Sequence, residues 1–109
     1  PFALNNLAYL LAREGRELNY ALQLAEQAGR LLPGSAEVQD TLAYLYLRLG
    51  MREKAVEAFD RMIAHAAEER KQPLLTLRAK TQRGELQQAA RLLEEARDKA
   101  ASLLPGAKS

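Results

Sequence analysis

The chain has 109 residues, of which 48% are hydrophobic and 28% charged, and its 16 Lys and Arg nearly balance its 14 Asp and Glu. This composition is typical of one globular domain, and interspersed charges of both signs argue against a nucleic-acid footprint. The lack of cysteine excludes disulfides, thiol catalysis and cysteine-ligated metals. Neither a membrane span nor a signal peptide is recognisable, and because the first residue is Pro1, we expect a piece of a longer protein.

Apolar residues recur every three or four positions along almost the whole chain, which is the period of amphipathic helices. Leu32-Pro33-Gly34-Ser35 separates two helices, with Ser35 as the predicted N-cap, and Gln72-Pro73 is expected to end the fourth helix. The tail from Pro105 to Ser109 is expected to be frayed. Three glycines are expected to end helices in left-handed geometry: Gly15, Gly50 and Gly84. The predicted helices are 2–14, 17–31, 36–49, 52–71, 74–82 and 85–103.

The most informative feature of the sequence is its self-similarity at a period of 34 or 35 residues. Ala21, Ala55 and Ala89 lie 34 residues apart, and the three glycines have almost the same period. A period of this size made of two helices predicts a solenoid, because one hairpin cannot bury its apolar face without a neighbour. Ala8 and Ala43 are small enough to let two helices approach closely.

The repeat resembles the tetratricopeptide repeat (TPR) family, whose pattern is W-x2-L-G-x2-Y, then A-x3-F, then P. The first unit contains Leu4-x2-Leu7-Ala8-x2-Leu11 and Ala21-x3-Ala25, followed by Pro33. The second unit contains Leu42-Ala43-x2-Tyr46 and Ala55-x3-Phe59. The resemblance covers nearly the whole chain and implies an all-α, right-handed solenoid of about three helical hairpins.

In the third unit the register of the fifth helix stays open, because either Leu77 or Ala79 could take the small-residue position. The run from Asn5 to Leu11 is most similar to bacterial TPR proteins, including those of exopolysaccharide export and envelope assembly. The resemblance therefore implies one TPR-like domain over 1–109, belonging to a longer array. Its expected repeats are about 2–33, 36–71 and 74–104.

In TPR proteins the first helix of each hairpin lines a concave surface that binds a peptide or partner segment. The resemblance assigns this surface to the first and third helices, where Tyr and Arg are favourable anchors because they combine large area with a polar handle. The expected partner segment has a basic residue facing the two acidic positions and an acidic residue facing the arginines. The expected partner-binding residues are Asn5, Asn6, Tyr9, Arg13, Glu37, Asp40, Tyr44 and Arg48.

Two points about this surface stay open. The amide of Asn6 could pair with a peptide backbone or with a neighbouring helix. The tyrosines could instead pack within their own hairpins, and the arginines could pair with acidic residues on the surface. The candidates for such pairs are Glu14, Glu17 and Glu53.

No arrangement typical of an enzyme, cofactor site or metal site is present. The chain has no glycine-rich phosphate loop and no G-x-S-x-G element. His65 is the single histidine, so it lacks the companions that zinc binding or acid–base catalysis requires, and we expect it to face solvent. The basic stretch 70–83 is diluted by acidic residues and lacks aromatic ones, which argues against nucleic-acid binding.

The function expected from these observations is a protein–protein interaction scaffold without enzymatic activity, metal or cofactor. Two alternatives remain: a structural spacer or self-assembly module, and the non-catalytic repeat region of a larger enzyme. The first helix has no polar outer face to protect it, so the isolated chain could form a homodimer. The residues expected to be partly uncovered are Phe2, Leu4, Leu7 and Leu11. The cellular compartment stays open.

Overall fold

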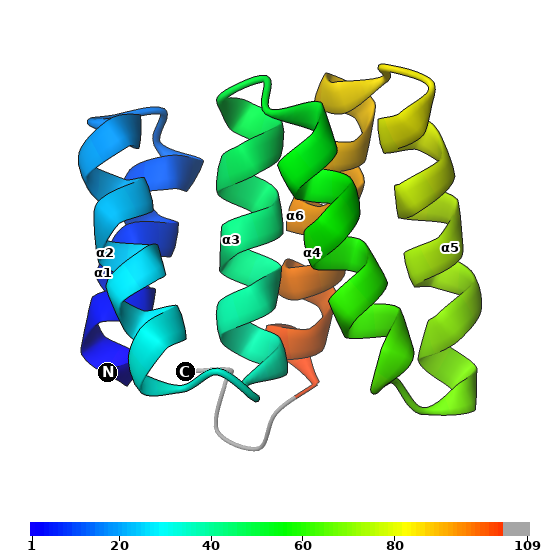
Figure 1. Cartoon of the computed structure of the whole chain (residues 1–109), viewed down its shortest axis with the longest axis horizontal. Helices are drawn as coiled ribbons and strands as arrows, with labels where there is room; N and C mark the ends of the chain where they lie inside the picture. The colour runs from blue at the N-terminus through cyan, green and yellow to red at the C-terminus, as the bar shows by residue number, and fades with distance from the viewer. Residues whose placement is uncertain (104–109) are drawn as a thin grey trace.

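The computed structural model describes residues 1–103, which form six α-helices joined by short connections (Figure 1). No β-strand occurs in these residues, so the all-helical prediction is confirmed for them. The predicted fraying from Pro105 to Ser109 concerns residues outside the described part of the chain. The helices are α1 (Phe2–Arg13), α2 (Leu18–Leu31), α3 (Ala36–Arg48), α4 (Arg52–Ala64), α5 (Glu68–Gln82) and α6 (Leu86–Ser102).

The turns within the three hairpins and the start of α3 follow the local signals in the sequence. Gly15, Gly50 and Gly84 have φ angles of 70°, 75° and 82°. This left-handed region strains most side chains but suits glycine. Ser35 is the N-cap of α3, and its Oγ accepts a hydrogen bond from the amide of Val38 at 3.3 Å. The predicted helix ends at these four positions are confirmed.

The boundary between the fourth and fifth helices differs from the sequence prediction. Helix α4 ends at Ala64 and α5 begins at Glu68, so the predicted helix 52–71 and the predicted start at residue 74 are wrong. The second hairpin therefore ends, and the third begins, about two helical turns earlier in the chain than expected.

Pro73 does not break the helix that contains it. It lies in the second turn of α5, where its missing amide removes one backbone hydrogen bond. Leu74 and Leu77, one and four residues after Pro73, are buried in the core, and this burial outweighs the local preference of proline. Leu77, not Ala79, is the inward-facing residue, which fixes the register of the fifth helix.

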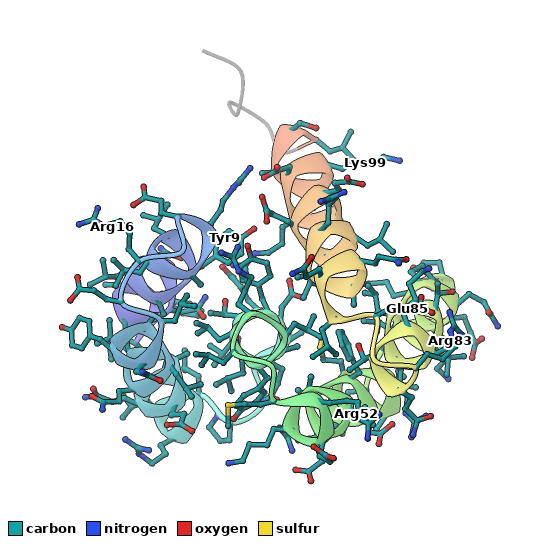
Figure 2. All side chains as sticks on the ribbon, turned by 90° about the horizontal axis from the view of Figure 1, so that it is seen from above. Tyr9, Arg16, Arg52, Arg83, Glu85 and Lys99 are labelled. Atoms are coloured by element: carbon teal, nitrogen blue, oxygen red, sulfur yellow. The ribbon has the colours of Figure 1, made fainter. Side chains whose placement is uncertain are left out.

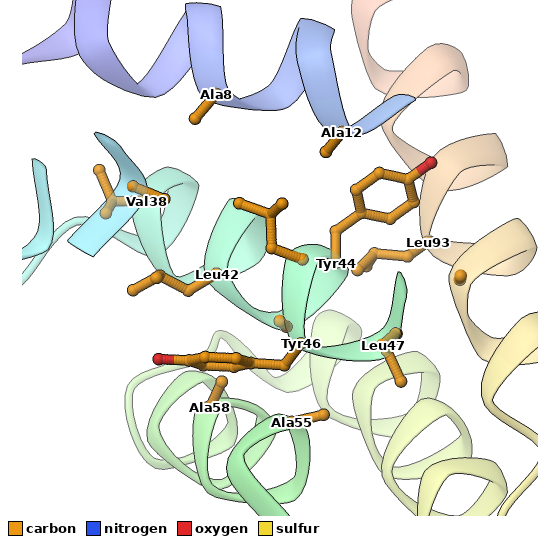
Figure 3. Packing of buried hydrophobic residues seen from close by; sticks show 14 of the residues in the cluster. Ala8, Ala12, Val38, Leu42, Tyr44, Tyr46, Leu47, Ala55, Ala58 and Leu93 are labelled. Atoms are coloured by element: carbon orange, nitrogen blue, oxygen red, sulfur yellow. The ribbon is translucent and has the colours of Figure 1, made fainter. Parts of the chain in front are cut away.

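The core is organised around α3, which packs against α1, α2, α4 and α6 (Figure 2). Eight of its 13 residues are buried. Small residues permit the close crossings that the repeat pattern predicted, because Ala8, Ala43 and Ala55 are fully buried. Figure 3 shows Tyr46 projecting from α3 over Ala55 and Ala58 of α4. A central helix with neighbours on every side therefore positions the surfaces described below.

The third hairpin does not place its first helix beside α3. Helix α5 packs against α4 and α6, and it is α6 that packs against α3. In Figure 2, α1 and α6 lie in the upper half of the view, and α2 and α4 lie in the lower half. In the TPR arrangement the helix packed against α3 would be α5, because α5 is the first helix of its hairpin. The described residues therefore form packed helical hairpins in which α6 faces the two helices expected to bind a partner.

Candidate interaction surface on α1 and α3

Most of the residues predicted to bind a partner lie along one side of α6. Asn5 is an exception because it is fully buried, and Asn6 is another because it is exposed and has no hydrogen bond to α6 within residues 1–103. Arg48 is linked to these residues only indirectly, because it donates a hydrogen bond to the hydroxyl of Tyr44. We use the name docking face for the α1 and α3 side chains that lie against α6 or its charged residues: Tyr9, Arg13, Glu37, Asp40, Thr41 and Tyr44.

Helix α6 meets the docking face through three charged side chains, Glu94, Arg97 and Asp98. Their spacing of three and four residues places all three on one side of a helix. Arg13 donates a hydrogen bond to each carboxylate oxygen of Asp98, both at 2.6 Å. Its Nε also lies 3.4 Å from an oxygen of Glu94. A planar guanidinium bound in this two-pronged way fixes the direction as well as the position of α6.

Arg97 is the most enclosed charged residue of α6 in this contact. Its guanidinium carbon lies 3.7 Å from the centroid of the Tyr9 ring, which is a close cation–π arrangement. It donates a hydrogen bond to Thr41 Oγ1 at 2.7 Å. Its nitrogens lie 3.8 Å from a carboxylate oxygen of Asp40 and 3.9 Å from one of Glu37. The basic residue of α6 thus faces the two acidic residues of α3.

Tyr44 is fully buried between α3 and α6 and points toward α6 beside Leu93 (Figure 3). Its hydroxyl donates to a carboxylate oxygen of Glu94 at 2.7 Å and accepts from Arg48 at 3.0 Å. Burial, together with the hydrogen bond to Glu94, raises the pKa of Tyr44 to about 12. The rings of Tyr9 and Tyr44 are 5.4 Å apart and inclined by 55°, so the tyrosines pack across two hairpins and not within their own.

Several polar atoms at or near the docking face have no hydrogen-bond partner among the described residues. They are both side-chain amide atoms of Asn5, the hydroxyl of Tyr9 and Oδ1 of Asp40. Burial raises the pKa of the Asp40 carboxyl to about 6, although the positive charges of Arg97 and Arg70 oppose this change. An unsatisfied buried polar group costs about 1–3 kcal/mol, so α6 fits this face incompletely.

The apolar part of the α6 contact is small. Only Ala89, Ala90 and Leu93 are buried among the residues of α6. Two of these side chains are methyl groups, so α6 itself contributes little apolar area to the contact beyond Leu93. Charged and hydrogen-bonded contacts therefore specify where α6 lies.

The sequence alone did not single out Glu94, Arg97 or Asp98. A usable signal was present, because Arg97 lies four residues after Leu93 and seven after Ala90, within the apolar stripe of the helix. A charged residue at such a position needs a partner when the stripe is buried. The sequence does not say where that partner comes from, since Arg13 and Asp98 are 85 positions apart.

Elsewhere in residues 1–103 no metal or membrane site is apparent. No group of three or more His, Asp or Glu side chains there could hold a metal ion. None of the six helices combines the length and apolar character that a membrane crossing requires. His65 is exposed, as expected, but lies at the C-cap of α4 and not within the helix.

Comparison with known proteins gives no significant match. No family model matches the chain, and neither a curated protein nor a solved structure is significantly similar to it. The TPR resemblance rests on the sequence pattern, and inferences about function rest on the geometry of the docking face.

Proposed function

We propose that this chain is a protein-interaction domain of the TPR type, in which α1–α4 form two hairpins of a right-handed solenoid, and that it binds a helical segment of a partner protein on the docking face. The observation that carries the proposal is the way α6 lies there. Its acidic residues face Arg13, and its basic Arg97 faces Glu37 and Asp40. This is the charge pattern expected of a partner segment from the sequence, which supports the docking face as a surface that accepts a helix.

The contacts of α6 define the chemistry of such a partner. The segment is an amphipathic helix with two acidic side chains four residues apart and a basic side chain three residues after the first. The acidic pair reaches Arg13 and Tyr44, and the basic residue lies over Tyr9. Charge complementarity of this kind determines orientation and partner choice more than raw affinity.

In the free chain a partner has to compete with α6 for this face. The apparent affinity of a partner is reduced by the fraction of molecules in which α6 is displaced. A second consequence is that the partner can make hydrogen bonds that α6 does not make, because the Tyr9 hydroxyl can donate or accept one and Asp40 Oδ1 can accept one.

Selection of helical peptides against the whole chain tests this proposal. We expect the selected peptides to carry the acidic, basic and acidic pattern and to bind Arg13→Glu at least roughly 30-fold more weakly, as for loss of an interface anchor. The matched control is Arg91→Glu, which reverses a charge at an exposed position of α6. Peptides whose binding is lost with Arg91→Glu but not with Arg13→Glu would show that a different face binds.

A second candidate function, self-assembly, is favoured by the outer side of α1. Leu7 and Leu10 are 44% and 56% exposed, whereas Leu42 and Leu45, 35 positions later, are 5% and 0% exposed. Leu42 packs on Gly29 of α2, so a neighbouring hairpin covers this position in the second unit. We propose that another hairpin or a second copy covers α1 in the same way.

The residues exposed on α1 differ in part from those expected. Phe2 and Leu7 are exposed and Leu4 is partly buried, but the predicted exposure of Leu11 is wrong, and Leu10 is exposed in its place. Leu11 belongs to the core because it lies on the side of α1 that faces the other helices. Leu10→Glu should reduce any concentration-dependent association seen by sedimentation, and association unchanged by it would contradict this second candidate.

A further inference from the structure

The connection between α4 and α5 is unlike the other four connections in residues 1–103. Each of the others contains glycine: Gly15, Gly34, Gly50 and Gly84. The corner His65–Ala67 contains neither glycine nor proline, and it follows Ala64 directly. Alanine is the strongest helix former, and the N-cap of α5, Ala67, has no side chain that can cap the helix.

On the α4 side of this corner the backbone hydrogen bonds are long, and a recess lies beside it. The two backbone hydrogen bonds that close α4, from His65 to Met62 and from Ala66 to Ile63, are both 3.3 Å long. A recess of about 350 Å³ lies beside the corner and is lined in part by Met62, His65, Ala66 and Ala67. Local sequence therefore favours a continuous helix where tertiary packing imposes a bend, a conflict of the kind that permits two arrangements of one chain.

If α4 and α5 joined into one straight helix, α5 and α6 would move as a unit away from their present neighbours. The contacts they lose are those of α5 with α4 and of α6 with the docking face. A second copy of the chain can supply the same contacts without any change of residue, because it presents an identical α4 and an identical docking face. The occupant that fits the vacated docking face is therefore the α6 of that second copy.

We infer that two copies of this chain exchange their α5–α6 hairpins. In the exchanged dimer residues 52–82 form one helix in each copy, and α6 of each copy lies on the docking face of the other. The exchange requires no foreign partner, so it goes beyond the proposed function and can fail while that function stands. Only the corner differs between the two arrangements.

The ion pair between Arg13 and Asp98 allows the exchange to be detected by complementary charge reversal. Arg13→Glu places a carboxylate against Asp98 and Glu94, and Asp98→Arg places a guanidinium against Arg13. Each single variant therefore has like charges at the contact, whether α6 is exchanged or not. An exchanged dimer made of one copy of each has one contact with both charges reversed, which restores the attraction, and one contact with the wild-type pair.

The two variants are mixed, warmed through the unfolding transition, cooled and analysed by native mass spectrometry. We expect the ratio of mixed dimers to homogeneous dimers, which is about one for random pairing of equal amounts, to rise on the order of tenfold. In the matched control both substitutions are made in one chain, and this chain is mixed with wild type. An exchanged dimer of these two chains would have like charges at both contacts, so no mixed dimer should form. Mixed dimers that form equally in both mixtures, or in neither, overturn the exchange.

A hinge variant tests the corner itself and does not depend on charge reversal. Glu68→Pro suits the closed corner, because Glu68 is the first residue of α5 and Ala67 before it has φ −65° and ψ 155°. In a continuous helix the same proline would disrupt the backbone. Wild-type chain, half of it isotope-labelled, should give dimers of intermediate mass after warming, and Glu68→Pro should reduce them on the order of tenfold. Dimers unaffected by Glu68→Pro, or no dimers at all, overturn the inference.

Discussion

Replacing the buried carboxyl of Asp40 by the amide of asparagine should remove a pH-dependent cost to stability. Asp40 lies on the docking face, and one of its oxygens is buried without a hydrogen-bond partner among the described residues. Burial raises its pKa from the usual 3.8 to about 6. The folded state thus binds a proton more tightly than the unfolded state does, so this residue favours folding at low pH and opposes it as pH rises from 3.8 to about 6.

The size of the effect follows from the pKa difference. One pKa unit corresponds to about 1.4 kcal/mol, so a rise of somewhat over two units gives a cost of about 3 kcal/mol above pH 6. The asparagine of the Asp40→Asn chain cannot ionise, and its amide can also donate where the carboxylate can only accept. Relative to wild type, the Asp40→Asn chain should therefore gain stability as pH is raised.

Urea unfolding followed by far-ultraviolet circular dichroism measures this difference. The free energy of unfolding of Asp40→Asn minus that of wild type should rise by about 2–3 kcal/mol between about pH 4 and about pH 7. The difference between the chains isolates residue 40 from the other titrating groups. A difference that is constant with pH would refute the reasoning, and one that falls with pH would mean that the Arg97 charge dominates over burial.

Three further substitutions should change the free energy of urea unfolding. Gly29→Ala should stabilise the folded chain by about 0.5–1 kcal/mol, because alanine favours the helix and its Cβ would lie 3.4 Å from Leu42 Cδ1, in ordinary contact. Destabilisation would mean that the contact between α2 and α3 has no room for a methyl group. Ala55→Leu should cost about 1–3 kcal/mol by overpacking a fully buried site, and an unchanged melting temperature would contradict the packing of α4. Arg97→Lys keeps the charge but loses the planar group over Tyr9 and should cost about 1–2 kcal/mol, whereas unchanged stability would show that charge alone holds α6.

The parts of the fold that could be predicted from sequence are those fixed by local chemistry. Gly50 forms the turn after α3 because glycine accepts a φ of 75°. Ser35 is the N-cap of α3 because its hydroxyl accepts a hydrogen bond from the amide of Val38. Pro73 shows the limit of such signals. Its local preference was expected to end a helix, but burial of Leu74 and Leu77 on the core keeps this segment helical.

The docking face was also partly predictable. Tyr9 and Tyr44 occupy equivalent places 35 positions apart, and the TPR resemblance assigned both to the concave side of the first and third helices. Their neighbour could not be predicted, because the choice between α5 and α6 depends on packing among segments that are distant in the sequence. The buried state of Tyr44, the pairing of Arg13 and the role of Arg97 all depend on that choice.

The central position of α3 also bears on how the chain unfolds. In an open stack of repeats each unit contacts only its neighbours, so the ends can fray independently. Here α3 touches four helices, and the ion pair between Arg13 and Asp98 joins the first helix to the last. Backbone amides of α3 should therefore exchange with solvent only in the global unfolding event, and the two terminal hairpins should lose protection together. Release of α6 then requires this global opening, so monomers and exchanged dimers should interconvert only as fast as the chain unfolds.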